Sequence, residues 1–217
     1  MTHSGTIDGS DDSRTAREAL RVADPVLARL IDRLEPLDLA TWRARWSLDP
    51  FRALARTIAG QQIAGRAAEA IFGRLQVLIG DRDPATAIAS ASDAELRTVG
   101  LSGAKAASLR DLAARTLDGR LQLDRIPELS DDDARAQLTG VRGIGPWTAD
   151  LFLLAQLGRQ DVLPASDLGI RRAVQLAYGL ERIPTEREVE QLGEAWRPHR
   201  SLATAYLYSS LRAAANR

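Results

Sequence analysis

The chain has 217 residues, with 29 acidic and 29 basic side chains, so its formal net charge at pH 7 is zero. It has no cysteine, which excludes disulfides and cysteine-ligated iron–sulfur clusters. No apolar run has the length of a membrane span, and the N-terminus lacks the basic-then-apolar order of a signal peptide. We therefore expect a cytoplasmic protein that buries a substantial core.

The N-terminal part predicts a disordered lead followed by helices. Residues 1–13 are polar and have no periodic apolar face. Further along, Asp24, Asp49 and Asp83 each precede a proline, and an aspartate before a proline is typical of a helix start, where the aspartate caps and the proline occupies the first turn.

Helix signals continue through the rest of the chain. Ser92 with Glu95 and Thr185 with Glu188 have the spacing of capping boxes, and Ser130 can cap a further helix. Apolar residues recur at helical spacing, whereas strand signals are scarce. We therefore predict an all-α fold in which residues 14–217 form one compact domain.

A glycine-rich segment at residues 138–150 carries the most information. Its centre reads Thr139-Gly140-Val141-Arg142-Gly143-Ile144-Gly145-Pro146. The glycines predict a tight turn with uncovered amides, and Pro146 suits the first position of the next helix. Free amides beside a helix N-terminus are a binding site for a phosphate. The pattern predicts a helical hairpin at about residues 131–158.

This segment resembles the helix-hairpin-helix of the HhH-GPD superfamily of base-excision DNA glycosylases, and most nearly the AlkA-like 3-methyladenine glycosylases (type II). The resemblance covers about residues 45–212. Beside the hairpin it rests on the blocks Gly60-Gln61-Gln62-Ile63, Gly100-Leu101-Ser102-Gly103-Ala104-Lys105-Ala106 and Trp196-Arg197-Pro198-His199-Arg200-Ser201. It implies two helical lobes with the active cleft between them and the hairpin at its mouth. We expect no counterpart of the N-terminal β domain that the larger relatives have.

Asp167 is the candidate catalytic residue. It follows Trp147 by 20 residues, which matches the distance from the hairpin to the catalytic aspartate in the family. Breaking an N-glycosidic bond leaves positive charge on the sugar, so a fixed carboxylate stabilises the transition state and can orient or deprotonate the attacking water. We expect Asp167 in the first turn of a helix; the alternative is that it is only a helix cap.

Trp147 occupies the position where the resemblance places the nucleophilic lysine of bifunctional relatives. A tryptophan cannot form a Schiff base, and Lys105, the only lysine, falls in another block. This predicts a monofunctional glycosylase without lyase activity. An indole can instead stack on a flipped cationic base, and Tyr208 matches a second aromatic residue of the base pocket. The alternative for Trp147 is a core residue between helices.

The Gln-Gln block matches the part of the family that fills the hole left by a flipped base. By this match Gln62 is the wedge, with Ile63 beside it. The alternative is a solvated loop between two helices.

The hairpin also has candidate ligands for DNA. Gly143 and Gly145 would offer amides to a phosphate, while the carbonyls of Thr139, Val141 and Ile144 match the family's monovalent-cation site, for Na⁺ or K⁺. Arg142 and Lys105 are candidate phosphate contacts or, alternatively, solvated charges. We expect no required cofactor, because the two histidines, His3 and His199, are far apart and suggest no zinc site.

Three functions are consistent with these residues. The first is a monofunctional glycosylase, monomeric on double-stranded DNA, that removes alkylated purines such as 3-methyladenine and 7-methylguanine. Because these bases are already cationic, their departure needs no general acid. The second is a related glycosylase for etheno, deaminated or oxidised bases. The third is a hairpin module that binds DNA without catalysis, although pure binding does not require Asp167.

Overall fold

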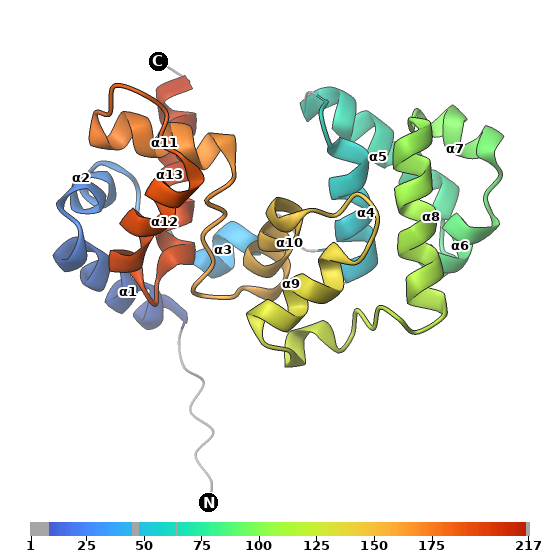
Figure 1. Cartoon of the computed structure of the whole chain (residues 1–217), viewed down its shortest axis with the longest axis horizontal. Helices are drawn as coiled ribbons and strands as arrows, with labels where there is room; N and C mark the ends of the chain where they lie inside the picture. The colour runs from blue at the N-terminus through green and yellow to red at the C-terminus, as the bar shows by residue number, and fades with distance from the viewer. Residues whose placement is uncertain (1–8, 45–47, 64, 216–217) are drawn as a thin grey trace, which may run out of the picture. The chain divides into compact units, whose positions relative to one another are not determined.

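The computed structural model describes residues 9–44, 48–63 and 65–215, and all regular elements in these ranges are helices (Figure 1). The all-α prediction is therefore confirmed. The chain divides into two compact units, which we call unit 1 (Met1–Arg45 and Gly158–Arg217) and unit 2 (Trp46–Leu157). Among the described residues no helix is both long and apolar enough to cross a membrane.

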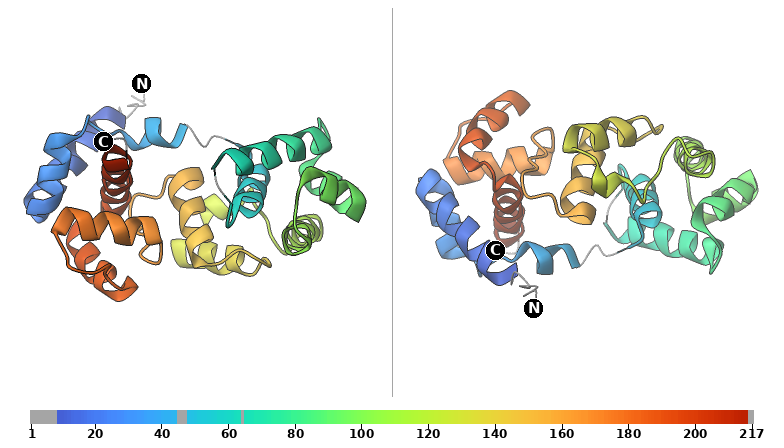
Figure 2. Two further views of the ribbon diagram at one scale, coloured as in Figure 1. Left: turned by 90° about the horizontal axis from the view of Figure 1, so that it is seen from above. Right: turned by 90° about the horizontal axis from the view of Figure 1, so that it is seen from below.

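Unit 1 combines the two ends of the chain. Its helices are α1 (Gly9–Ala23), α2 (Pro25–Arg33), α3 (Leu39–Ala44), α11 (Leu168–Tyr178), α12 (Glu186–Gly193), the short 3₁₀ helix η3 (Glu194–Trp196) and α13 (Arg200–Ala215). Helix α13 packs against α1 and α2 on one side and against α11 on the other (Figure 2). Apolar and aromatic side chains such as Leu20, Leu27, Trp196 and Tyr206 are almost wholly buried there.

A buried carboxylate ties three elements of unit 1 together. Asp24 caps α2 by accepting hydrogen bonds from the amides of Val26 (2.7 Å) and Leu27 (3.2 Å). Its other oxygen accepts from the indole N–H of Trp196 (2.8 Å) and from the hydroxyl of Tyr178. Burial acts to raise the pKa of Asp24, but the hydrogen bonds from Tyr178, Trp196 and the two amides outweigh it, so the pKa lies below its ordinary value.

Unit 2 contains the middle of the chain. Its helices are α4 (Pro50–Gly60), α5 (Gly65–Ile79), α6 (Pro84–Ser90), α7 (Asp93–Val99), α8 (Gly103–Leu117), the 3₁₀ helix η1 (Ile126–Glu128), α9 (Asp131–Thr139), α10 (Pro146–Phe152) and the π-helical turn η2 (Leu153–Leu157). Helix α4 packs against α5, α8 and α10 (Figure 1). Leu54, Ile58, Leu75 and Leu109 are among its fully buried core residues.

The helix starts predicted from capping patterns are confirmed. Asp24, Asp49 and Asp83 each accept a backbone amide of the following first turn. Both predicted capping boxes, Ser92 with Glu95 and Thr185 with Glu188, have both of their hydrogen bonds. These caps are local, so a few consecutive residues are sufficient to specify them.

The predicted boundary of the N-terminal lead at residue 13 is wrong. Helix α1 begins at Gly9, and Ser13 is buried and donates a hydrogen bond to Asp38 (3.0 Å). The rest of the predicted lead, residues 1–8, lies outside the described residues. The start of α1 was not predicted, because Ser13 is buried by a contact with Asp38, 25 residues away in sequence.

We predict that Asp24→Ala lowers the free energy of unfolding by about 3 kcal/mol, because it removes a helix cap and leaves the buried indole N–H of Trp196 and the half-buried hydroxyl of Tyr178 without their acceptor. Urea unfolding followed by circular dichroism measures the loss. As a control, Asp83→Ala removes an exposed cap of the same kind and should cost only about 1 kcal/mol. Equal losses in the two variants would contradict a special role for Asp24.

The same carboxylate predicts a pH dependence of stability. Because the folded-state pKa of Asp24 lies below the ordinary value of an aspartate, the ionised form stabilises the folded state above about pH 4. This contribution is lost as the pH falls through the folded-state pKa. Asp24→Asn lacks it at every pH, so the stability difference between wild type and Asp24→Asn should shrink between pH 5 and pH 3. A constant difference would contradict the assignment.

Candidate DNA-binding and catalytic site

The predicted hairpin is present in unit 2. Ser130 caps α9 by accepting from the amide of Asp133 (3.1 Å), and Pro146 occupies the first turn of α10. Helices α9 and α10 pack together, and the Arg135 guanidinium donates to the Asp150 carboxylate between them (2.7 Å). The turn between the two helices is fixed on its inner side by buried Val141 and Ile144.

The turn directs two amides outward. The amides of Gly143 and Gly145 donate no hydrogen bond to any residue in the described part of the chain, whereas the Ile144 amide donates to Val141 (3.1 Å). Gly143 has a φ of +78°, and a Cβ there would lie 2.4 Å from the Ser108 hydroxyl. Only glycine therefore fits, and the two free amides have the chemistry expected for a phosphate site.

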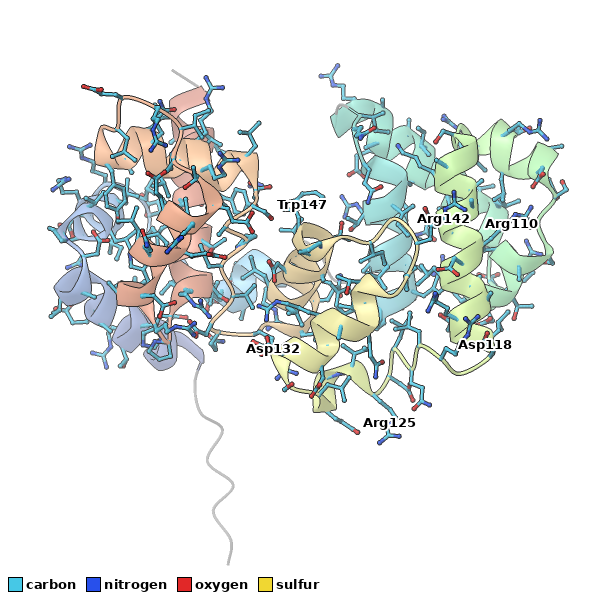
Figure 3. All side chains as sticks on the ribbon, viewed as in Figure 1. Arg110, Asp118, Arg125, Asp132, Arg142 and Trp147 are labelled. Atoms are coloured by element: carbon cyan, nitrogen blue, oxygen red, sulfur yellow. The ribbon has the colours of Figure 1, made fainter. Side chains whose placement is uncertain are left out.

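Arg142 lies in the turn, where its side chain and its backbone amide have different surroundings. Its side chain is exposed on the hairpin loop (Figure 3). Its backbone amide donates to the carboxylate of Asp111 on α8 (2.7 Å). Asp111 was not predicted from the sequence, because 31 residues separate it from Arg142 and no local pattern marks it.

The candidate cation ligands differ from one another. The Val141 carbonyl accepts the hydrogen bond from the Ile144 amide, whereas the carbonyls of Thr139 and Ile144 accept none from backbone amides within the described residues. Backbone carbonyl oxygens suit a monovalent cation. These three carbonyl oxygens therefore suit the predicted Na⁺ or K⁺.

Trp147 lies in the first turn of α10 (Figure 3) and is partly exposed. Trp196 of unit 1, by contrast, is fully buried. The next three residues of α10, Thr148 to Asp150, are buried. These side chains, rather than that of Trp147, pack the helix against its surroundings. Trp147 therefore has indole surface accessible for stacking, as the pocket interpretation requires.

The Gln-Gln block forms the loop after α4. Gln62 has a φ of +60°, the only positive φ of a non-glycine residue in the described ranges, and its side chain is exposed. Ile63 is also exposed. A left-handed conformation without glycine is strained, and such strain is common at functional sites. Preceding it, Gln61 donates its side-chain amide to the carbonyl of Gly143 (2.8 Å).

Lys105 lies close to the same loop. Its ammonium group donates to the carbonyl of Ala59 in the last turn of α4 (2.8 Å). Burial lowers the pKa of Lys105 below its ordinary value. The Lys105 side chain, predicted from the sequence as a candidate phosphate contact, therefore has a hydrogen-bond acceptor within unit 2.

Asp167 and Tyr208 lie near one another in unit 1. Asp167 is the N-cap of α11, one residue before the first turn in which it was expected, and one of its oxygens accepts from the Ile170 amide (2.8 Å). A Cβ on Gly169 would lie 2.8 Å from that oxygen and 3.6 Å from the Tyr208 ring. Gly169 therefore leaves space for the carboxylate and the ring to approach the same point. Asp167 is both a cap and a carboxylate held beside an aromatic ring.

The block Trp196–Ser201 has an architectural role instead. Trp196 binds Asp24, and Arg197 and Arg200 both form ion pairs with Asp161 (2.6 Å each). His199 belongs to no metal-binding group: within the described ranges no three His, Cys, Asp or Glu residues are arranged so that they could hold a metal ion.

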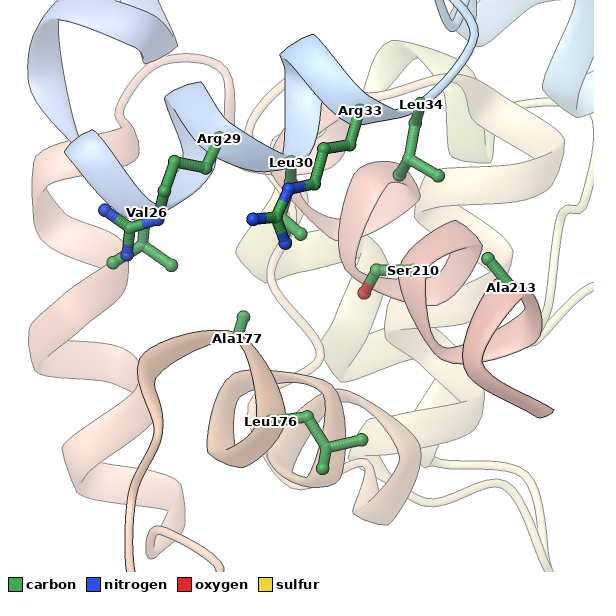
Figure 4. A pocket seen from close by; sticks show the side chains of 9 residues that line it. All are labelled: Val26, Arg29, Leu30, Arg33, Leu34, Leu176, Ala177, Ser210 and Ala213. Atoms are coloured by element: carbon green, nitrogen blue, oxygen red, sulfur yellow. The ribbon is translucent and has the colours of Figure 1, made fainter. Parts of the chain in front are cut away.

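A groove of about 330 Å³ in unit 1 contains none of the predicted site residues (Figure 4). Arg29 and Arg33 of α2 line it opposite Leu176 and Ala177, in the last turn of α11. Asp167 caps the other end of α11, roughly 13 Å away at 1.5 Å per residue. The groove is therefore not the base pocket.

Comparison with known proteins agrees with this geometry. The family model described as "HhH-GPD superfamily base excision DNA repair protein" matches residues 55–198. DNA-3-methyladenine glycosylase 1 of Schizosaccharomyces pombe is 34% identical over 165 residues, which cover 75% of this chain and 72% of that protein.

Solved structures give the same result. A 3-methyladenine DNA glycosylase of Schizosaccharomyces pombe in complex with abasic DNA superposes with a TM-score of 0.77 at 30% identity, covering 89% of this chain and 95% of the other. A 3-methyladenine DNA glycosylase from Archaeoglobus fulgidus gives 0.75 at 27% identity, covering 94% and 70%. This chain therefore belongs to the HhH-GPD superfamily of base excision DNA repair proteins.

Proposed function

We propose that this protein is a monofunctional DNA glycosylase that flips alkylated purines such as 3-methyladenine and 7-methylguanine out of duplex DNA and hydrolyses their N-glycosidic bond. The observation that carries the proposal is Asp167, held as the cap of α11 beside Tyr208, in a chain whose hairpin helix has Trp147 instead of a lysine. The relatives named as 3-methyladenine glycosylases support the substrate class.

Asp167 acts electrostatically in this mechanism. Its carboxylate is oriented at the N-terminus of α11 by a hydrogen bond from the Ile170 amide (2.8 Å). As the base departs, positive charge develops on the sugar, and a preorganised carboxylate beside the sugar stabilises this transition state more than the ground state, in which the sugar is uncharged. The same group orients or deprotonates the water that attacks the anomeric carbon.

In this proposal Trp147 and Tyr208 each offer an aromatic ring to the flipped base. An alkylated purine is cationic, and a cation over an indole or phenol face is stabilised by the ring quadrupole. Since the leaving base already carries its positive charge, no general acid is needed. This explains why a single carboxylate suffices.

The hairpin holds the DNA backbone in this proposal. The amides of Gly143 and Gly145 bind a phosphate, with the exposed side chain of Arg142 nearby. The carbonyls of Thr139, Val141 and Ile144 would hold Na⁺ or K⁺, whose positive charge would help to neutralise that phosphate. Gln62, with Ile63 beside it, enters the duplex in place of the flipped base.

We predict that Asp167→Asn reduces single-turnover release of methylpurines from methylated duplex DNA by about 100-fold or more, because the amide cannot stabilise a cationic sugar. Chromatography of the free bases measures the rate. Asparagine also caps helices, so the melting temperature should change little. Asp124→Asn, at an exposed position of unit 2, is the control and should leave the rate unchanged. Full activity of Asp167→Asn would overturn the mechanism.

We also predict that strands break only after alkali. Without a lysine at position 147, no Schiff base forms with the abasic sugar, so borohydride should trap no covalent protein–DNA complex. Gel electrophoresis before and after alkali tests this. Trapping in the wild type that disappears in Lys105→Met would show lyase chemistry and contradict the monofunctional assignment.

A further inference from the structure

The loop after α4 and the hairpin turn are joined by side chains of unit 2. The Gln61 side-chain amide donates to the carbonyl of Gly143 (2.8 Å). That carbonyl belongs to the residue whose own amide is free for a phosphate. Gln62, the proposed wedge, is the next residue after Gln61. One hydrogen bond thus links the residue before the wedge to the phosphate-binding turn.

Helix α8 contacts both segments from one side. Lys105 binds the carbonyl of Ala59 at the end of α4, and Asp111 accepts the Arg142 amide of the turn. Between them, the Ser108 hydroxyl lies against Gly143. These three residues of α8 are spaced three apart, so they follow one side of the helix. The loop and the turn therefore share a single support.

The conformation of Gln62 makes such support necessary. A left-handed φ of +60° is unfavourable for glutamine and persists only where neighbouring contacts enforce it. The flanking backbone bonds of the loop are long: Gln61 to Ile58 and Ile63 to Gly60 are both 3.4 Å. The shorter side-chain bonds of Gln61 and Lys105 are therefore the principal polar restraints on the loop.

We propose that Gln61 and Lys105 are positioning residues that hold Gln62 at a fixed distance from the phosphate-binding turn. Lys105 acts on the loop rather than on DNA. The inference rests on the proposed function, in which Gln62 replaces a flipped base. A wedge fixed relative to the bound phosphate enters the stack at the correct step, whereas a loose loop must be ordered during each flipping event.

The role can be separated from a merely structural one by the substrate. A purine opposite a normal base must be unpaired and its place filled, whereas a lesion opposite an abasic site has no partner to leave and needs the wedge less. A positioning defect should therefore slow the first substrate much more than the second. A defect in folding or in the catalytic carboxylate slows both equally.

We would measure single-turnover release of one 7-methylguanine from two duplexes, with cytosine or an abasic site opposite the lesion. For Gln61→Ala and Lys105→Met we expect about a tenfold loss with the paired lesion, the effect of one hydrogen bond, and less than a twofold loss with the unpaired one. Lys105→Arg keeps a donor and should restore most of the rate. Gln137→Ala, an exposed glutamine on α9, is the matched control and should behave as wild type.

Equal losses on the two duplexes, or no loss in Gln61→Ala, would overturn the inference. A second readout needs no catalysis: 2-aminopurine placed beside an abasic site reports entry of the wedge by its fluorescence on protein binding. Gln61→Ala should reduce this change while melting at the wild-type temperature. If wild type releases no base but changes the fluorescence in a Gln61-dependent way, the proposed function fails and the positioning role stands. An unchanged fluorescence response in Gln61→Ala overturns the role itself.

Discussion

The close approach of Gly143 to helix α8 is the constraint on which the DNA-binding part of unit 2 depends. No side chain fits at this position, since a Cβ would lie 2.4 Å from the Ser108 hydroxyl and the φ of +78° disfavours other residues. This approach brings the Gly143 carbonyl to Gln61 and the neighbouring Arg142 amide to Asp111. The turn is thereby held within unit 2, while the amides of Gly143 and Gly145 have no acceptor among the described residues.

In the proposed function, binding through amides explains how a DNA repair protein can have no net charge. Several arginines are engaged within the protein: Arg197 and Arg200 with Asp161, and Arg135 with Asp150. These arginines thus support the fold and are engaged by carboxylates of the same chain. In the proposed function, the partial charges of the hairpin and of a helix N-terminus supply the attraction for phosphate that a basic surface supplies elsewhere.

Local patterns predicted much of the fold and the hairpin, because caps, glycine turns and Pro146 act over a few residues. The position of Asp167 as a cap follows from the same kind of signal, and its assignment as catalytic comes from its distance to the hairpin. Contacts between distant segments were not predictable. Ser13 is buried against a partner 25 residues away, and Asp111 reaches the hairpin across 31 residues. The left-handed conformation of Gln62 was not predictable either, because nothing in a Gln-Gln pair indicates a positive φ.

The central claim is that Asp167 stabilises positive charge on the sugar, and affinity for stable sugar analogues tests it directly. Duplex DNA with a cationic pyrrolidine abasic analogue and the same duplex with a neutral tetrahydrofuran analogue differ chiefly in that charge. Fluorescence anisotropy should give at least tenfold tighter binding of wild type to the cationic duplex, and Asp167→Asn should remove the difference. Equal affinity of wild type for both duplexes, or a preference that survives in Asp167→Asn, would contradict the account.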